Sequence, residues 1–279
     1  MTTSYEQTVR QAREDRTSLV LVDREGSRAV VTLNDPEKLN PLSAALTVQL
    51  REALEELAAD HAVRAIVLTG ADPAFSAGGD LRLMRDTAHP MVDEGAEGAA
   101  AVWRWIRNEF GGIAKLIARS DKAFVAAVNG AAAGVGLAFA LTCDLILVSA
   151  RARLVPAFGR IGLVPEVGTS WTLTRRLGYQ RTFELFAGGR HLSGAEAADL
   201  GLANAVFAHN RLLPEALEWC ERIETLPPHV QWMMKPLLRN AADMTWEQAI
   251  AMEEFAEPMS FTTRAHREAV EALLASEQG

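Results

Sequence analysis

The sequence predicts an α/β protein with a largely parallel sheet, followed by a helical last third. Short apolar strands alternate with loops and helices through the first part of the chain, which is the pattern of repeated βαβ crossovers. From about Thr169 onward helical patterns take over, with capping boxes at 193–196 and 245–248. Of the 279 residues, 49% are hydrophobic, so the chain can bury a sizeable core.

The first predicted elements are two strands, 18–23 and 28–33. Both runs are rich in residues that favour strands, and the polar, glycine-containing turn between them indicates a hairpin. A helix is expected over 42–59 because its apolar residues have helical spacing, and Ser43 is its expected N-cap. A short apolar strand is predicted at 64–69.

Residues 84–118 are expected to be mostly helical, and strands and helices are expected to alternate again after them. Strands are predicted at 123–128 and 145–149, with a helix over 134–141 between them. This order of strand, helix and strand indicates a crossover between neighbouring parallel strands.

The chain divides into three parts by composition. Residues 1–17 are polar and form either a loose tail or a short helix. Residues 18–200 form the α/β core, and residues 201–279 form a helical C-terminal region in which Pro227-Pro228 marks a break.

Composition argues against several classes of protein. The net charge is −8 without a long basic run, which argues against nucleic acid as a main partner. No charge-free apolar run reaches about 18 residues, so no membrane span is expected. The polar N-terminus does not resemble a secretory signal, and we expect a cytoplasmic protein.

Cys143 and Cys220 are expected to be structural thiols, and no His or Cys has metal-ligand spacing, so we expect no metal site.

The segment Gly130–Gly136 follows a predicted strand and opens a predicted helix. Its small residues allow a tight turn, and the free N–H groups at a helix start favour a negatively charged oxygen. The spacing of its glycines fits neither a dinucleotide-binding fingerprint nor a phosphate-binding P-loop. Close helix–sheet packing without a ligand explains the small residues equally well, so both interpretations stay open.

A second glycine-rich loop, Phe75–Asp80, follows the strand at 64–69. Gly78 and Gly79 permit unusual backbone angles and expose N–H groups. If these N–H groups and those at the start of the 134–141 helix meet on one oxygen, they form an oxyanion hole. Asp80 has the more ordinary expected role of a helix cap.

Glu166 is a single carboxylate among apolar residues, glycine and proline. Burial of this side chain would raise its pKa and make it a better base. The alternative is an acid near the N-terminus of the helix that begins at Thr169, which is a common placement without chemistry. Lys38, Arg82 and Arg85 are either solvated surface charges or contacts for phosphate groups.

Five segments together resemble the enoyl-CoA hydratase/isomerase (crotonase) superfamily: LNDPEKLNPLS, AFSAGGDL, AAVNGAAAGVG, CDLIL and GLVPEVGTSW. The resemblance runs from about Ser18 to the C-terminus and depends on the order and spacing of all five. It implies a crotonase-like ββα spiral of repeated βαβ units with a helical C-terminal trimerisation region. It also implies homotrimers, often paired into hexamers, and coenzyme A thioester substrates without a prosthetic group.

The resemblance implies roles for residues in this sequence. The amides of Gly79 and Val135 correspond to the pair that polarises the thioester carbonyl. Lys38 and Leu39 lie where the family contacts the CoA nucleotide, and the backbone of Ser76–Gly78 receives the adenine. The expected substrate-binding residues, which include two pocket-wall aromatics, are Lys38, Leu39, Ser76, Ala77, Gly78, Gly79, Gly134, Phe158 and Trp171.

The catalytic carboxylates differ from those of the family's hydratases. Those enzymes use two glutamates, and the resemblance places them at Ala138 and Phe158 of this chain. The acid stands instead at Glu166, within a PEVGTSW element similar to that of the phenylacetate-pathway ring-epoxide isomerase and the dienoyl-CoA isomerases. We therefore expect an acyl-CoA isomerase that works through an enolate. A single-carboxylate hydratase or lyase and a non-catalytic acyl-CoA binder are the alternatives.

Overall fold

The computed structural model describes residues 5–88 and 94–276, and the chain divides into two compact units, Met1–Cys220 and Glu221–Gly279. The sequence pattern predicts the division between core and C-terminal region after residue 200. The first unit extends further because β12 (Ala205–Phe207) is a strand of its main sheet, paired in parallel with β9 (Leu145–Ser149).

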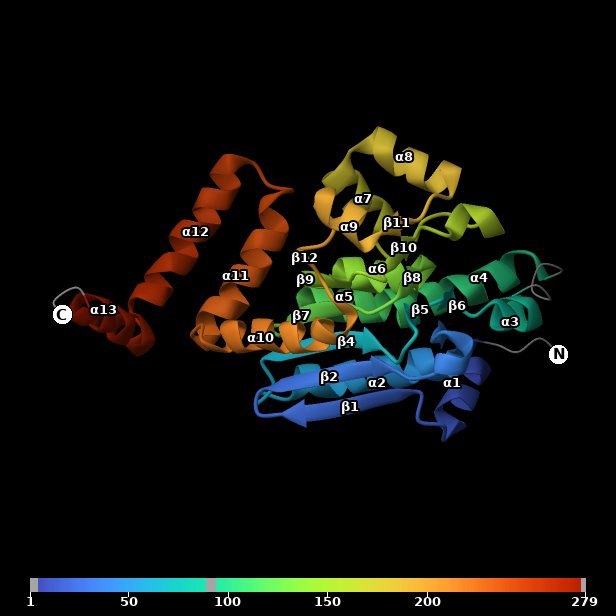
Figure 1. Cartoon of the computed structure of the whole chain (residues 1–279), viewed down its shortest axis with the longest axis horizontal. Coiled ribbons are helices and arrows are strands. Elements are labelled where there is room, and N and C mark those ends of the chain that lie inside the picture. Colours follow the sequence, from blue (N-terminus) through green and yellow to red (C-terminus); the bar gives the residue numbers. More distant parts are fainter. Residues whose placement is uncertain (1–4, 89–93, 277–279) are drawn as a thin grey trace. The chain divides into compact units, whose positions relative to one another are not determined.

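The main sheet of the first unit has six strands in the order β1-β2-β4-β7-β9-β12 (Figure 1). Only β1 and β2 pair antiparallel, and the other neighbours are parallel, as the alternating pattern predicted. The four strands introduced here are β1 (Val20–Glu25), β2 (Arg28–Leu33), β4 (Ala65–Gly70) and β7 (Ala123–Val128).

The hairpin differs from its prediction in the position of β1, which begins and ends two residues later than expected. Arg24 and Glu25 belong to the strand, and Glu25 pairs directly with Arg28. Polar residues are accommodated there because β1 is an edge strand whose side chains are mostly exposed.

The centre of the sheet is fully buried. Every residue of β4 and of β7 is buried, which explains why both read as continuous apolar runs without alternation. Phe75, Phe124 and Phe139 are the largest fully buried side chains of this core.

Two small sheets lie at the ends of the main strands and were not predicted, because their strands have only two or three residues. One has the order β11-β10-β8-β5, and the other pairs β3 with β6 in parallel. Their strands are β3 (Pro41–Leu42), β5 (Ala74–Ser76), β6 (Gly78–Gly79), β8 (Ala131–Ala133), β10 (Arg153–Val155) and β11 (Leu192–Ser193).

Helices cover the strands of the first unit. The predicted N-cap Ser43 is confirmed, since its hydroxyl accepts a hydrogen bond from the Leu46 N–H at 3.2 Å. The helices are α1 (Tyr5–Glu14), α2 (Ala44–Ala59), α3 (Leu81–Leu83), α4 (Ala96–Trp105), α5 (Gly111–Arg119), α6 (Gly134–Thr142), α7 (Thr169–Leu177), α8 (Tyr179–Gly188), α9 (Gly194–Asp199) and α10 (Leu212–Glu224), the last of which crosses the division between the units. Two π-helical turns, Met84–Ala88 and Ile106–Phe110, extend α3 and α4.

The second unit consists of helices, of which α11 (Pro228–Ala241), α12 (Trp246–Phe261) and α13 (Arg264–Ser276) lie wholly within it. The predicted capping box at the start of α12 is confirmed: Thr245 and Gln248 cap each other's backbone N–H groups. Large apolar side chains of α12 and α13 are exposed, among them Trp246, Phe255 and Leu273. Within the described ranges, no helix is both long and apolar enough to cross a bilayer.

Candidate active site

The glycine-rich loop after β5 lies against the start of α6. Gly78 has φ +87°, and a Cβ atom added there would stand 2.6 Å from the carbonyl oxygen of Ala133. Likewise, a Cβ on Gly136 would stand 2.7 Å from the Cβ of Ser76. Real Cβ atoms do not come so close to neighbouring atoms, so only glycine permits this contact between the two segments. The structure thus brings together the two glycine-rich segments that sequence analysis singled out.

Ser76 fixes the loop from within. Its buried hydroxyl donates to the carbonyl oxygen of Asn40 at 2.8 Å and accepts from the N–H of Gly78 at 3.1 Å. The Ala77 N–H donates to the Leu39 carbonyl at 2.8 Å, and β3 pairs with β6 so that Leu42 is opposite Gly79. The turn before β3 and the glycine loop are therefore one hydrogen-bonded assembly.

Asn40, which the sequence motifs do not single out, holds this assembly in place. Its buried Nδ2 donates to the carbonyl oxygens of Ala71 and Ala74, both at 2.7 Å, and its Oδ1 accepts from the Asp35 N–H at 2.8 Å. Asn40 also has a positive φ of 54°. The signal available in the sequence was an asparagine directly before Pro41, because asparagine tolerates the left-handed conformation and satisfies backbone groups in turns.

The two amides expected to form an oxyanion hole come from different elements. Gly79 lines a cavity, and Val135 is the second residue of α6, where N–H groups have no acceptor within the helix. Gly134 precedes it with φ +49°. The role of this pair of amides stays a prediction.

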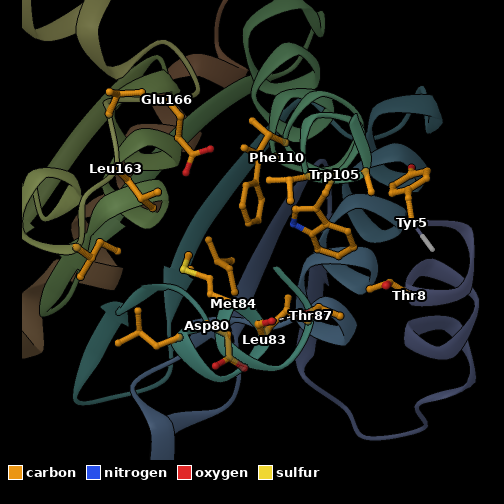
Figure 2. A pocket seen from close by; sticks show the side chains of 18 residues that line it. Tyr5, Thr8, Asp80, Leu83, Met84, Thr87, Trp105, Phe110, Leu163 and Glu166 are labelled. Atoms are coloured by element: carbon orange, nitrogen blue, oxygen red, sulfur yellow. Dashed lines mark hydrogen bonds between the residues drawn. The ribbon is translucent and has the colours of Figure 1, made fainter. Parts of the chain in front are cut away.

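A cavity of about 520 Å³ opens beside the glycine loop. Figure 2 shows Glu166 at one end of this cavity and Tyr5 with Thr8 at the other. The walls between them are mostly apolar, and their members include Leu42, Leu83, Met84, Val102, Trp105, Phe110 and Leu163. A volume of this size lies within the roughly 300–1,000 Å³ of small-molecule sites.

Glu166 is half-buried, and its side chain points into the cavity (Figure 2). Its Oε2 is buried and has no hydrogen-bond partner among residues 5–88 and 94–276. Burial raises the pKa of Glu166 to about 7, because desolvation disfavours the charged form. A carboxylate with this pKa can both accept and return a proton near neutral pH.

The helix that follows does not explain Glu166. The N-cap of α7 is Gly168, and no side chain of the described residues caps this helix. Only the backbone carbonyl of Glu166 takes part, accepting from the Thr169 N–H at 3.0 Å. Val167 and Gly168 both have positive φ, so the chain turns sharply between Glu166 and α7.

A family model described as enoyl-CoA hydratase/isomerase matches residues 23–275. The chain belongs to the enoyl-CoA hydratase/isomerase family. The predicted membership of the crotonase superfamily is confirmed, and with it the expectation of an enzyme family that acts on acyl-CoA thioesters.

Named relatives cover nearly the whole chain. A protein named probable enoyl-CoA hydratase from Rhizobium meliloti (strain 1021) is 33% identical over 256 residues, 92% of this chain and 95% of the relative. The 1,2-epoxyphenylacetyl-CoA isomerase of Escherichia coli (strain K12) is 30% identical over 246 residues, 88% of this chain and 91% of the relative. The crystal structure of an enoyl-CoA hydratase from Polaromonas sp. JS666 matches with a TM-score of 0.82 and 29% identity, covering 92% of this chain and 97% of that one. Hydratase and isomerase names occur at similar identities, so the choice between the two reactions depends on the site residues.

The solved structures of this family also confirm the crotonase-like fold. The residues expected to bind CoA differ in exposure, and Ser76 and Gly78 are buried within the glycine-loop assembly. Leu39 and Ala77 are exposed next to each other, joined by their backbone hydrogen bond. Lys38 is exposed, and its ammonium group pairs with Asp35 at 3.0 Å. Their contact with CoA stays a prediction.

Two expected wall residues are not among those that line the cavity. Phe158 is buried, with its ring 4.0 Å from the position of a Cβ on Gly134. Trp171 is half exposed, and the guanidinium carbon of Arg175 lies 4.8 Å from its ring centre. Their role in substrate binding stays a prediction. Trp105 and Phe110 line the cavity instead.

Asp80 caps α3, as sequence analysis expected: its Oδ1 accepts from the Arg82 N–H at 2.8 Å. Cys143 and Cys220 are buried, and neither forms a disulfide within the described residues. In the described part of the chain, no group of three or more His, Cys, Asp or Glu side chains is arranged to hold a metal ion.

Proposed function

We propose that this chain is an acyl-CoA isomerase in which Glu166 is the single acid and base. One observation supports this choice above the others: Glu166 places an unpaired carboxylate oxygen in an apolar cavity, with a pKa of about 7. A carboxylate in that environment suits a proton transfer at carbon, which needs a base of moderate strength that can give the proton back.

The proposed reaction begins with the thioester carbonyl between the N–H groups of Gly79 and Val135. Glu166 removes a proton from the acyl chain, and the electron pair of that C–H bond moves to form an enolate whose charge lies on the carbonyl oxygen. The protonated Glu166 then returns the proton at a different carbon, so the double bond or ring bond shifts and no atom is gained or lost. Each oxyanion donor contributes about 10²–10³-fold in comparable enzymes.

The two-glutamate hydration of the family's hydratases does not fit these residues. The resemblance places those glutamates at Ala138 and Phe158, and both side chains are buried and apolar. The second candidate is a hydratase that directs water with Glu166 alone. It is favoured by the hydratase name of the relative from Rhizobium meliloti.

Coenzyme A enters this proposal as part of the substrate. Lys38, Leu39 and the backbone of Ser76–Gly78 contact its nucleotide, which is supported by the exposure of Leu39 and Ala77 beside the cavity-lining Gly79. We also propose homotrimers assembled through the C-terminal region, residues 201–279, because α12 and α13 expose large apolar side chains that an isolated chain leaves in water.

Proton NMR in D₂O tests the reaction on a panel of 2-enoyl-, 3-enoyl- and arylacetyl-CoA thioesters. We expect deuterium in the acyl chain and a shifted bond without added water. Glu166→Gln removes the base with almost no change in shape and is expected to abolish turnover. Glu97→Gln, at an exposed position on α4, is the matched control and is expected to retain it.

The other outcomes decide against the isomerase. A 3-hydroxyacyl product identifies the single-carboxylate hydratase. Full turnover in Glu166→Gln removes Glu166 from its proposed role, and tight binding without exchange or product identifies a non-catalytic acyl-CoA binder.

A further inference from the structure

The far end of the cavity is built from the N-terminal helix α1. Tyr5 and Thr8, one helical turn apart, line the cavity at the end opposite Glu166 (Figure 2). The match to the enoyl-CoA hydratase/isomerase family begins at residue 23, so α1 lies outside the matched residues. This chain therefore closes its cavity with a segment that the family pattern does not specify.

A part-buried hydrogen bond fixes Tyr5. Its hydroxyl donates to Oε1 of Glu109 at 2.7 Å, and Oε2 of Glu109 lies 2.9 Å from Nε of Arg51. Glu109 is fully buried, so the loss of either partner would leave a buried carboxylate poorly compensated. Burial, reinforced by Glu109, also raises the pKa of Tyr5, so its hydroxyl stays protonated as a donor.

The C-terminal half of α1 is also attached to the first unit. Ala12 is buried, and Arg13 pairs with Glu52 of α2 at 2.9 Å. These contacts distinguish α1 from a loose polar tail and fix its inner face against the cavity.

Aromatic contacts connect α1 to the core along the cavity wall. The ring centres of Tyr5 and Trp105 are 6.5 Å apart, and those of Trp105 and Phe110 are 6.0 Å apart, both edge to face. Phe110 then meets Phe139 of α6 at 6.3 Å. Such pairs are stabilising at these separations, so a row of aromatic rings joins α1 to the core.

We propose that α1 is the end wall of the acyl pocket, and that Tyr5 and Thr8 limit the size of the acyl group. The substrate is then a large apolar acyl group, either a medium-length chain or an aryl-bearing one, whose far end reaches α1. This inference rests on the proposed function, since it assumes that the acyl group enters this cavity with its thioester near Gly79.

Calorimetric titration with saturated acyl-CoAs tests the proposal without any turnover. The panel is acetyl-, hexanoyl-, decanoyl- and phenylacetyl-CoA, and the variants are Thr8→Phe, which fills the end, and Thr8→Ala, which enlarges it. Gln11→Phe introduces the same side chain at an exposed position of α1 outside the cavity lining and is the control.

For Thr8→Phe we expect decanoyl-CoA to bind at least about tenfold more weakly, since each methylene excluded from the cavity costs about fourfold in affinity. Acetyl-CoA is expected to bind within about twofold of the unchanged protein, because a two-carbon group does not reach α1. Thr8→Ala is expected to shift the preference toward the longer chain. The tighter of hexanoyl- and phenylacetyl-CoA identifies the linear or the aromatic class.

An equal effect on all acyl lengths, or the same profile in Thr8→Phe and Gln11→Phe, would overturn the inference. The isomerase proposal can fail separately. A shifted binding profile without deuterium exchange would support α1 as the end wall and contradict the proposed reaction. Deuterium exchange that depends on Glu166, together with an unshifted binding profile, would contradict only the proposal that α1 is the end wall.

Discussion

The α-carbon of Gly78 lies so close to Ala133 that a Cβ atom at Gly78 would stand 2.6 Å from the Ala133 carbonyl oxygen. This contact joins the glycine loop to the residue before α6. Gly79 and Val135, whose amides we expect to bind the thioester oxygen, follow the two members of the contact by one and two residues. The distance between Gly78 and Ala133 therefore sets the spacing of the proposed oxyanion hole.

Gly78→Ala is expected to lower both stability and turnover. The substitution combines a positive φ, which costs a non-glycine residue about 1–3 kcal/mol, with a close approach to backbone. Gly26→Ala is the matched control, since Gly26 also has a positive φ of 59° but nothing within 4 Å of an added Cβ. Urea unfolding of both variants separates the cost of the positive φ, which both substitutions have, from the cost of the close approach, which only Gly78→Ala has. Equal losses of unfolding free energy would contradict a tight contact at Gly78.

The pH dependence of turnover follows from the environment of Glu166. The base must be ionised to remove a proton, and burial raises the pKa of Glu166 from 4.5 to about 7. We therefore expect kcat/KM to rise with pH and to reach half its maximum near a pH of about 7, as the free enzyme's base titrates. A profile that is already flat above a pH of about 5 would show that the base has an ordinary carboxylate pKa.

The same pKa shift predicts that Glu166 destabilises the folded protein at alkaline pH. The folded protein retains the Glu166 proton up to a pH of about 7, whereas the unfolded chain loses it near 4.5, so unfolding becomes more favourable as pH rises between these values. Glu166→Gln removes this cost. We expect the variant to equal the original protein below a pH of about 4.5 and to be more stable above 7, by on the order of 1–3 kcal/mol.

Chemical unfolding at a series of pH values measures this difference. Glu97→Gln serves as the control here as well, because Glu97 is exposed and is not among the residues that line the cavity. A Glu166→Gln protein that is less stable at alkaline pH would mean that the carboxylate has a partner when ionised.

The sequence was sufficient to predict the parts of the fold that depend on local patterns. The parallel strands are apolar on both faces, and Ser43 and Thr245 are recognisable caps, so these elements could be predicted from a few neighbouring residues. The order of five motifs predicted the family, and the family match confirms it.

The remaining features depend on contacts between distant segments. The strands β3 and β6 have two residues each and no periodicity, and they form only because the turn at Leu39–Asn40 meets the glycine loop. In the same way, nothing in the sequence around Tyr5 indicates that its hydroxyl reaches Glu109, 104 positions along the chain. Side chains at such positions become wall residues only after tertiary packing.

Trp103 and Trp105 lie two positions apart in α4 but have different surroundings. In the structure Trp105 lines the cavity and contacts Tyr5 and Phe110, whereas Trp103 is exposed, with the guanidinium carbon of Arg107 5.0 Å from its ring centre. Two positions along a helix are about 200° apart around its axis, so neighbouring tryptophans of this kind face opposite ways.

Trp105→Ala is expected to weaken binding of hexanoyl-CoA by about tenfold, because the acyl chain loses an apolar wall. Binding of free CoA should stay the same, since the loss is confined to the acyl end of the cavity, and this second titration separates a pocket effect from misfolding. Trp103→Ala is the matched control and should bind both ligands as the unchanged protein does. If Trp105→Ala bound both hexanoyl-CoA and free CoA as the unchanged protein does, the cavity beside Glu166 would not be the acyl pocket.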